Sequence, residues 1–175
     1  MVVSIDGFTE TKDKDMEWQA WGEDMINFMD NFMEGTDVII LGRNAFELME
    51  NYWPSEKIRK EEPVIAGRMN SIHKLVFSKT RNTTNWENTS FATDIDSEIA
   101  KLKQRPGKDI VLFGGQGLAQ AFMKKGLVDE YQLIVSPTAL GNGNPLFTEK
   151  HNLELLNATT MPSGNVILKY KNKQN

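Results

Sequence analysis

The sequence predicts an α/β fold built on a mostly parallel β-sheet that helices cover on both faces. Short apolar runs of strand length alternate along the chain with amphipathic stretches of helical period. This alternation favours parallel strands that are joined by helical crossovers. Near the C-terminus, two strand-like runs flank a Pro-Ser-Gly turn at residues 162–164, which predicts a hairpin of antiparallel edge strands.

Composition narrows the class of protein further. The chain has 175 residues, of which 39% are hydrophobic and 25% are charged. A chain of this length can bury a core without metals or disulfides, so we expect one domain, residues 1–175. The formal net charge of -4 argues against nucleic acid or an anionic membrane as the main partner. Because there is no cysteine, disulfides, thiolate metal sites and cysteine nucleophiles are excluded.

The sequence also indicates a location and the absence of a metal centre. The N-terminus lacks a basic segment followed by a long apolar stretch, and no apolar run approaches the ~20 residues that span a membrane. We therefore expect a cytoplasmic protein. The two histidines, His73 and His151, lie far apart in the sequence, so we expect no transition-metal site.

The first part of the chain predicts a strand, a long loop and a helix. Val2–Ile5 is a short apolar strand. Asp6–Trp21 is polar and longer than most loops, which makes it a candidate functional loop or flap. Glu23–Glu34 has the spacing of an amphipathic helix and ends at Gly35. The apolar face of this helix comprises Met25, Phe28, Met29, Phe32 and Met33.

In the middle of the chain, Asp37–Gly42 is a continuous apolar run that ends in glycine, which is typical of a strand buried on both faces. Asn44–Asn51 is a short helix, and residues 55–71 are charged and leave the choice between helix and loop open. The next expected elements are strands at Lys74–Ser78 and Asn85–Ala92 and a helix at Ile95–Gln104.

The last part of the chain predicts a strand, turn and helix followed by three more strands. Asp109–Phe113 is a strand, Gly114–Gly117 a glycine turn, and Leu118–Lys125 a helix. The later strands are Glu130–Ser136, Leu153–Thr159 and Val166–Tyr170. Leu140–Phe147 is rich in Gly and Asn, which supply positive φ, and is expected to be a turn-rich loop.

The glycine turn Gly114–Gly117 is the sharpest candidate for a binding site. A strand that ends in a glycine turn and opens a helix presents backbone N–H groups at a partly positive helix end, which favours phosphate. Glycines allow the backbone to approach the anion closely. The alternative interpretation is an ordinary tight turn between a strand and a helix.

Two other predicted strand ends carry groups that suit an anion. Arg43 follows the strand Asp37–Gly42, and its planar donor fork suits a phosphate monoester. Ser78 and Lys79 end the next strand with a hydroxyl and a cation. Each could instead be an ordinary surface residue. In a parallel sheet these strand ends and the glycine turn lie along one edge, where they could line a dinucleotide crevice.

These residues, taken with Ser4–Phe8, Gly42-Arg43 and Val128–Glu130, resemble the dihydrofolate reductase superfamily. Within it the sequence is most similar to the C-terminal reductase domain of the bacterial riboflavin-biosynthesis deaminase/reductase and its stand-alone relatives. The matching segments are Ser4–Phe8, Asp37–Glu47 and Gly114–Phe147. The resemblance implies a three-layer α/β/α sandwich around a mixed, mostly parallel sheet, NADPH as hydride donor, and a homodimer.

The resemblance also assigns residues to the cofactor. Gly42 and Arg43 would lie beside its adenosine, Ser78 and Lys79 would bind its 2′-phosphate, and the double glycine of Gly114–Gly117, often a cis peptide in the family, would hold the pyrophosphate. The cofactor-binding residues that the resemblance implies are, in full, Gly42, Arg43, Ser78, Lys79, Phe113, Gly114, Gly115, Gln116 and Gly117. Asp129 and Glu130 are the alternative, as ribose-binding acids that would favour NADH. One position departs from the folate enzymes, which usually have threonine where Ala45 stands.

On the substrate side, folate reductases use a carboxylate in the first helix with an aromatic residue four positions later, and Asp24 and Phe28 match this spacing. The alternative for Asp24 is an acid that stabilises the helix dipole. Trp18 and Trp21 could cover a planar substrate or pin the loop to the core. Asp24 is thus the first candidate for the catalytic acid, and Asp6 is the second. The folate enzymes' Pro-Trp pair is absent from the early loop, which argues against folate.

The sequence therefore predicts an NADPH-dependent reductase that transfers a hydride to a C=N or C=O bond of a small polar substrate, either a riboflavin-pathway pyrimidine or a pterin-like compound. A non-catalytic NADP(H)-binding regulatory or interaction module of the same fold is the alternative. An anion pocket that takes no dinucleotide is a third interpretation.

Overall fold

The computed structural model describes residues 1–173, and it confirms the mixed α/β class. The chain forms two compact units, of which one comprises Met1–Met25 and Ala119–Asn175 and the other Ile26–Leu118. Two helices, α1 (Glu23–Glu34) and α6 (Gln116–Lys124), contain the boundaries between these units. The single domain of residues 1–175 stays a prediction.

The Ile26–Leu118 unit is built on a fully parallel sheet. Its strands are β3 (Thr36–Gly42), β4 (His73–Phe77), β5 (Thr89–Ala92) and β6 (Asp109–Gly114), in the order β5-β4-β3-β6. The register pairs Gly42 with Phe77 and Leu41 with Gly114, so the three carboxyl ends meet at one edge of the sheet, as the sequence predicted. Ile39, Ile40 and Leu41 of β3 are fully buried, which explains its continuous apolar run.

Four helices lie wholly within this unit, and they include the charged segment whose structure the sequence left open. They are α2 (Arg43–Met49), α3 (Glu56–Glu61), α4 (Pro63–Ser71) and α5 (Ile95–Lys103). Ser55 caps α3 by accepting a hydrogen bond from the Ile58 amide, and Pro63 occupies the first position of α4, where its missing N–H costs nothing. Phe46 of α2 is fully buried between the rings of Trp86 and Phe91.

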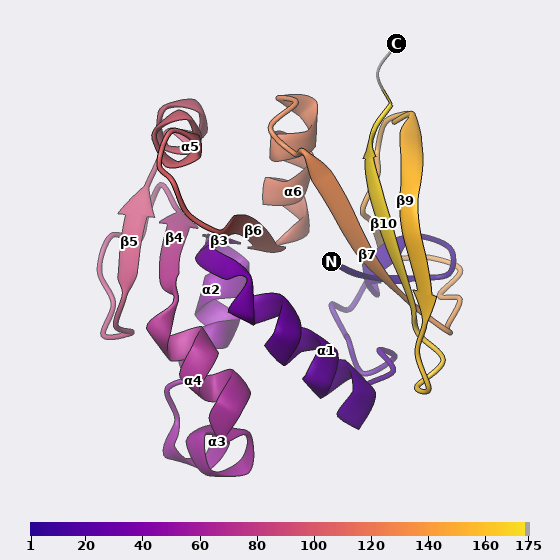
Figure 1. Ribbon diagram of the computed structural model, residues 1–175, viewed down its shortest axis with the longest axis horizontal. Coiled ribbons are helices and arrows are strands. Elements are labelled where there is room, and N and C mark those ends of the chain that lie inside the picture. Colours follow the sequence, from indigo (N-terminus) through magenta and orange to yellow (C-terminus); the bar gives the residue numbers. More distant parts are fainter. Residues whose placement is uncertain (174–175) are drawn as a thin grey trace. The chain divides into compact units, whose positions relative to one another are not determined.

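The other unit holds a mixed sheet. Its strands are β1 (Val2–Ser4), β7 (Glu130–Ser136), β9 (Leu153–Thr160) and β10 (Val166–Asn172), in the order β1-β7-β10-β9. β1 runs parallel to β7, and β9 and β10 form the predicted antiparallel hairpin, seen in yellow and orange in Figure 1. A register shift opposite Lys169 and Tyr170 leaves Leu156 as a bulge in β9.

Three details of the strands differ from the sequence-based expectation. The segments predicted as loops contain two very short strands, β2 (Phe8–Glu10) and β8 (Asn144–Pro145), which pair with each other. The strand predicted over Asn85–Ala92 begins only at Thr89, because Asn88 has a positive φ of 56° and interrupts it. The hydrogen bonds divide the strands among three sheets, where the sequence predicted one.

Within residues 1–173, no helix combines the length and the apolar character needed to cross a membrane.

Candidate cofactor and substrate sites

The edge where β3, β4 and β6 end is closely packed through glycine. A Cβ atom at Gly42 would lie 3.5 Å from Leu118 Cβ and 3.6 Å from the Gly115 amide nitrogen. A Cβ atom at Gly114 would lie 3.1 Å from Ala45 Cβ, which is tighter than most side-chain contacts. The peptide bond between Gly114 and Gly115 is cis, as the family resemblance implied. Ala45 therefore packs directly against the glycine pair.

Gly117 has a different environment. It is exposed at the start of α6, and a Cβ atom built there would meet no atom within 4 Å. The amide of Leu118 donates a hydrogen bond to the Gly115 carbonyl, which closes the turn. The first N–H groups of a helix have no partner within the helix, so this open space adjoins backbone donors of the kind that bind phosphate.

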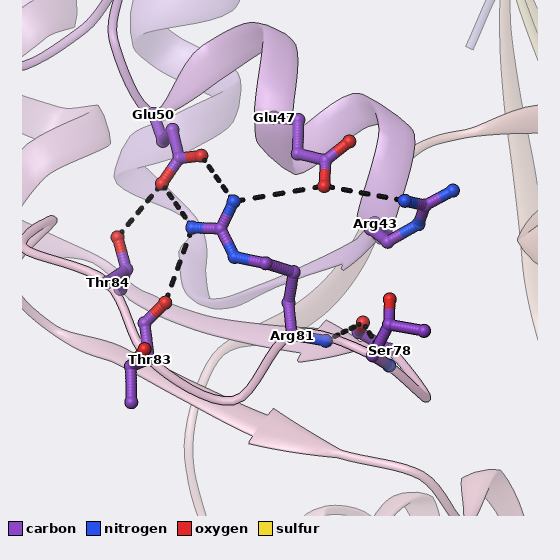
Figure 2. A network of polar contacts seen from close by, with 8 residues as sticks. Arg43, Glu47, Glu50, Ser78, Arg81, Thr83 and Thr84 are labelled. Carbon is purple, nitrogen blue, oxygen red and sulfur yellow. Dashed lines mark hydrogen bonds and ion pairs between the residues drawn. The ribbon is translucent and has the colours of Figure 1, made fainter.

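Beside the ends of β3 and β4, four charged side chains form a network (Figure 2). The guanidinium of Arg81 donates two parallel hydrogen bonds of 3.0 Å to the carboxylate of Glu50. Glu47 Oε1 lies 3.6 Å from Nη1 of Arg43 and 3.8 Å from Nη1 of Arg81. Thr84 donates a further hydrogen bond to Glu50. The network thus holds two arginines close to one carboxylate oxygen.

Arg81 is a residue that the sequence analysis missed. The turn after β4 brings it here, because the Ser78 hydroxyl accepts hydrogen bonds from the amides of Thr80, at 3.2 Å, and Arg81, at 2.9 Å. Ser78 is buried and Lys79 is exposed. The spacing of a serine followed three residues later by arginine was the available signal, since serine side chains commonly close such turns.

A pocket of about 390 Å³ adjoins Arg81. Its walls come from the end of α2 and from the segment between β4 and β5, and they are mostly polar. The lining residues are Glu50, Asn51, Pro54, Arg81, Thr83, Thr84, Asn85 and Trp86.

Phe113 is a further residue that the family resemblance assigned to the cofactor. It lies on β6 and is half-buried.

In the other unit, the carboxylate of Asp6 is held by three donors. It accepts hydrogen bonds from the Ser4 hydroxyl at 2.6 Å, the Leu140 amide at 3.0 Å and the Gly141 amide at 2.7 Å. These bonds, that from Ser4 foremost, lower the pKa of Asp6 to about 2. Asp6 therefore ties the predicted loop Leu140–Phe147 to the end of β1, and it is ionised at neutral pH.

Asp24 is also held by backbone. Its Oδ2 atom accepts a hydrogen bond of 2.9 Å from the Ser163 amide in the turn between β9 and β10, and this bond lowers the pKa of Asp24. The same turn supplies Asn165, whose side-chain amide donates to the Ala20 carbonyl at 2.8 Å and to the Ser163 hydroxyl at 2.8 Å. Ser136 accepts a hydrogen bond from the Ala20 amide. Asn165 and Ser136 thus anchor Ala20 in the segment before α1, and the sequence analysis missed both of them.

The aromatic candidates differ in exposure. Trp21 is 49% exposed, whereas Trp18 is half-buried and donates a hydrogen bond from its indole to the Asp15 carbonyl. Phe28 lies one helical turn beyond Asp24 on α1 and stacks on Phe32, with ring centroids 6.2 Å apart. Trp21 is thus the aromatic side chain of this group with the most surface left for a ligand.

The parallel sheet with glycine-lined strand ends, and the mixed sheet with its C-terminal hairpin, define a mixed α/β protein of the dihydrofolate reductase-like class. The family model of the RibD C-terminal domain matches residues 1–167, and the chain belongs to this family.

Three sequence relatives match most of this chain. "Uncharacterized protein YyaP" of Bacillus subtilis (strain 168) is 37% identical over 97% of this chain and 91% of its own length. "Uncharacterized protein YwjB" of the same organism is 30% identical over 87% of this chain and 82% of its own length. The riboflavin biosynthesis protein RibD of Corynebacterium ammoniagenes is 32% identical over 80% of this chain, which spans 42% of that protein.

Solved structures share the fold at low sequence identity. A protein of Shewanella sp. PV-4 named for riboflavin biosynthesis matches with a TM-score of 0.77 at 19% identity, over 99% of this chain and 97% of that chain. A pyrimidine reductase-like protein from Corynebacterium diphtheriae matches with a TM-score of 0.63 at 16% identity, over 99% of this chain and 90% of that chain. RibD of Acinetobacter baumannii matches with a TM-score of 0.73 at 14% identity, over 99% of this chain and 56% of that chain.

Proposed function

We propose that the protein is an NADPH-dependent reductase that transfers a hydride to a C=N or C=O bond of a small polar substrate. A pyrimidine intermediate of riboflavin synthesis and a pterin-like compound are the two substrate classes we consider. The observation that carries the proposal is the shared edge of β3, β4 and β6, which ends in Gly42 and Gly114 and is followed in the chain by Arg43 and Arg81, in a member of the RibD C-terminal domain family.

The residues present at this edge suit NADPH. The space at Gly117 and the first turn of α6 could accept the pyrophosphate, because nothing lies where a side chain would stand. Arg43 and Arg81 could bind the 2′-phosphate that distinguishes NADPH from NADH. When bound, NADPH supplies the hydride, and the protein's part is to hold and orient it.

On the substrate side, we propose that Asp24 binds the substrate rather than donating a proton. Its lowered pKa keeps it ionised at neutral pH, and a carboxylate accepts hydrogen bonds from N–H groups such as those of pyrimidines and pterins. The exposed face of Trp21 offers a surface on which a planar ring can stack. Asp6 is the second candidate acid, but its carboxylate already accepts three hydrogen bonds.

The second candidate function, a non-catalytic NADP(H)-binding module, is favoured by the state of the two acids. Both Asp6 and Asp24 are bound by backbone amides that lower their pKa, so neither is a proton donor at neutral pH. Such a module would bind the cofactor and turn over no substrate.

A thermal-shift titration with NADPH and NADH tests cofactor binding, because a ligand that binds the native state raises the melting temperature. We expect a larger rise with NADPH than with NADH. NADPH oxidation is then followed with riboflavin-pathway pyrimidines, pterins and dihydrofolate as substrates. Oxidation that requires one of the first two supports the reductase, whereas binding without oxidation supports the module. Failure to bind either dinucleotide would refute both functions.

A further inference from the structure

The network in Figure 2 is electrically balanced, which bears on how it could bind a phosphate. Two arginines, Arg43 and Arg81, face two carboxylates, Glu47 and Glu50. Glu50 is 15% exposed and makes the two short bonds to Arg81, so this pair forms the fixed part of the network. Glu47 is 35% exposed, and its contacts of 3.6 and 3.8 Å are longer than hydrogen bonds. Glu47 is therefore the loosely held carboxylate.

The position of Glu47 resembles that of a phosphate oxygen. Its single atom Oε1 lies between Nη1 of Arg43 and Nη1 of Arg81. A ribose 2′-phosphate that contacts both arginines through these atoms needs the same position. Two anions cannot share it without strong repulsion, so the phosphate must displace the carboxylate or bind one arginine alone.

We propose that Glu47 is a specificity-determining residue that competes with the 2′-phosphate of NADPH for Arg43 and Arg81. The inference rests on the proposed function, since it concerns the same cofactor. Glu47 lies within ion-pair distance of both guanidinium groups. On binding, the phosphate takes its place, and the repulsion that remains limits the preference for NADPH over NADH.

Arg81 is better placed than Lys79 to be the second cation. Its guanidinium is fixed by Glu50 and by the Thr83 carbonyl. It also lies 5.7 Å from the centre of the Phe46 ring. A planar donor held in this way loses little freedom when an anion binds. Lys79 is exposed on a flexible stem, so ordering it costs more.

The substitution Glu47→Gln tests the proposal, because glutamine is nearly isosteric but carries no charge. We expect the affinity for NADPH to rise by about two- to fivefold, the scale of a half-exposed charge interaction, and the affinity for NADH to stay unchanged. The gain should shrink at high salt, which screens exposed charges. Glu56→Gln is the matched control, since it removes one charge from a fully exposed pair with Lys60 on α3.

Adenosine 2′,5′-bisphosphate and 5′-ADP are the minimal probes, measured by calorimetry on wild type, Glu47→Gln, Arg43→Ala and Glu56→Gln. We expect Glu47→Gln to raise the affinity for the 2′,5′-bisphosphate and to leave the affinity for 5′-ADP unchanged. Arg43→Ala should lower the affinity for the 2′,5′-bisphosphate alone. An unchanged or weaker 2′,5′-bisphosphate affinity in Glu47→Gln overturns the proposal, while NADPH binding to wild type leaves the proposed function standing. A wild type that binds neither dinucleotide refutes the proposed function and this inference together.

Discussion

Individual glycines offer the cleanest test of the pyrophosphate site. Gly117→Ala places a methyl group where no atom lies within 4 Å, so we expect folding to be unaffected and NADPH affinity to fall at least about tenfold, because the methyl enters the space proposed for phosphate. Gly67→Ala is the control: it also meets no atom, lies inside α4, and should stabilise the protein by about 0.5–1 kcal/mol. Melting curves and NADPH titrations distinguish the two. Wild-type affinity in Gly117→Ala would remove α6 from the cofactor site.

Asp24 can be tested at the same scale. Asp24→Asn keeps an oxygen that can accept the hydrogen bond from the Ser163 amide, so we expect the fold and the NADPH affinity to be retained. Once a substrate is found, the loss of charge should lower kcat/KM, because an amide binds substrate N–H groups less strongly than a carboxylate. Steady-state kinetics of Asp24→Asn and Asp6→Asn provide the comparison. Unchanged kinetics in Asp24→Asn would leave it as an acid that only anchors the start of α1.

At the scale of elements, the side chain of Lys74 on β4 caps the backbone carbonyls at the C-terminal end of helix α4. Its ammonium is fully buried and donates hydrogen bonds to the carbonyls of Met69, Asn70 and Ile72, and it lies 4.6 Å from the centre of the Trp86 ring. Lys74→Met removes these donors, so we expect a loss of about 1–3 kcal/mol in the free energy of unfolding at neutral pH. Lys101→Met, at an exposed position of α5, should change it by less than about 0.5 kcal/mol. Denaturant unfolding measures both.

The same lysine predicts a pH dependence. Burial lowers the pKa of Lys74 from 10.5 to about 8 in the folded protein. Between these values the unfolded chain binds the proton and the folded chain does not, so the free energy of unfolding rises with pH, by up to about 1.4 kcal/mol per unit. We therefore expect wild type to gain stability relative to Lys74→Met from pH 8 to pH 10. A constant difference between the two proteins would show that the pKa of Lys74 is unperturbed.

At the scale of the whole molecule, we propose that the protein is a homodimer, as the family resemblance implied. Strand β9 is an edge of the mixed sheet, and it exposes Leu155 by 53% and Leu156 by 41%. An edge strand offers unpaired backbone groups to a second copy. Light scattering should give twice the chain mass of 19.9 kDa, and Leu155→Glu should shift the mass toward one chain. A wild-type mass of one chain would contradict the dimer.

Local sequence patterns alone determined most of the elements. Helix α1 spans Glu23–Glu34 and strand β7 spans Glu130–Ser136, with the same bounds in the sequence analysis and in the structure. These bounds follow from periodicity and from glycine, which act within a few residues of the chain. The prediction that the ends of β3, β4 and β6 share an edge is also confirmed, because alternating strands and helices impose parallel pairing. The roles of the predicted site residues stay predictions.

Only the tertiary structure decided which charges meet. Arg81 joins Arg43 and Glu47 through a turn that the Ser78 hydroxyl closes, and no local pattern links residues so far apart in the sequence. Asp6 stood in the sequence as a candidate acid, but the amides of Leu140 and Gly141 from the far end of the chain engage its carboxylate. The pairing of β2 with β8 is equally non-local. Hydrogen bonds and ion pairs depend on distance in space, which a pattern of neighbouring residues does not contain.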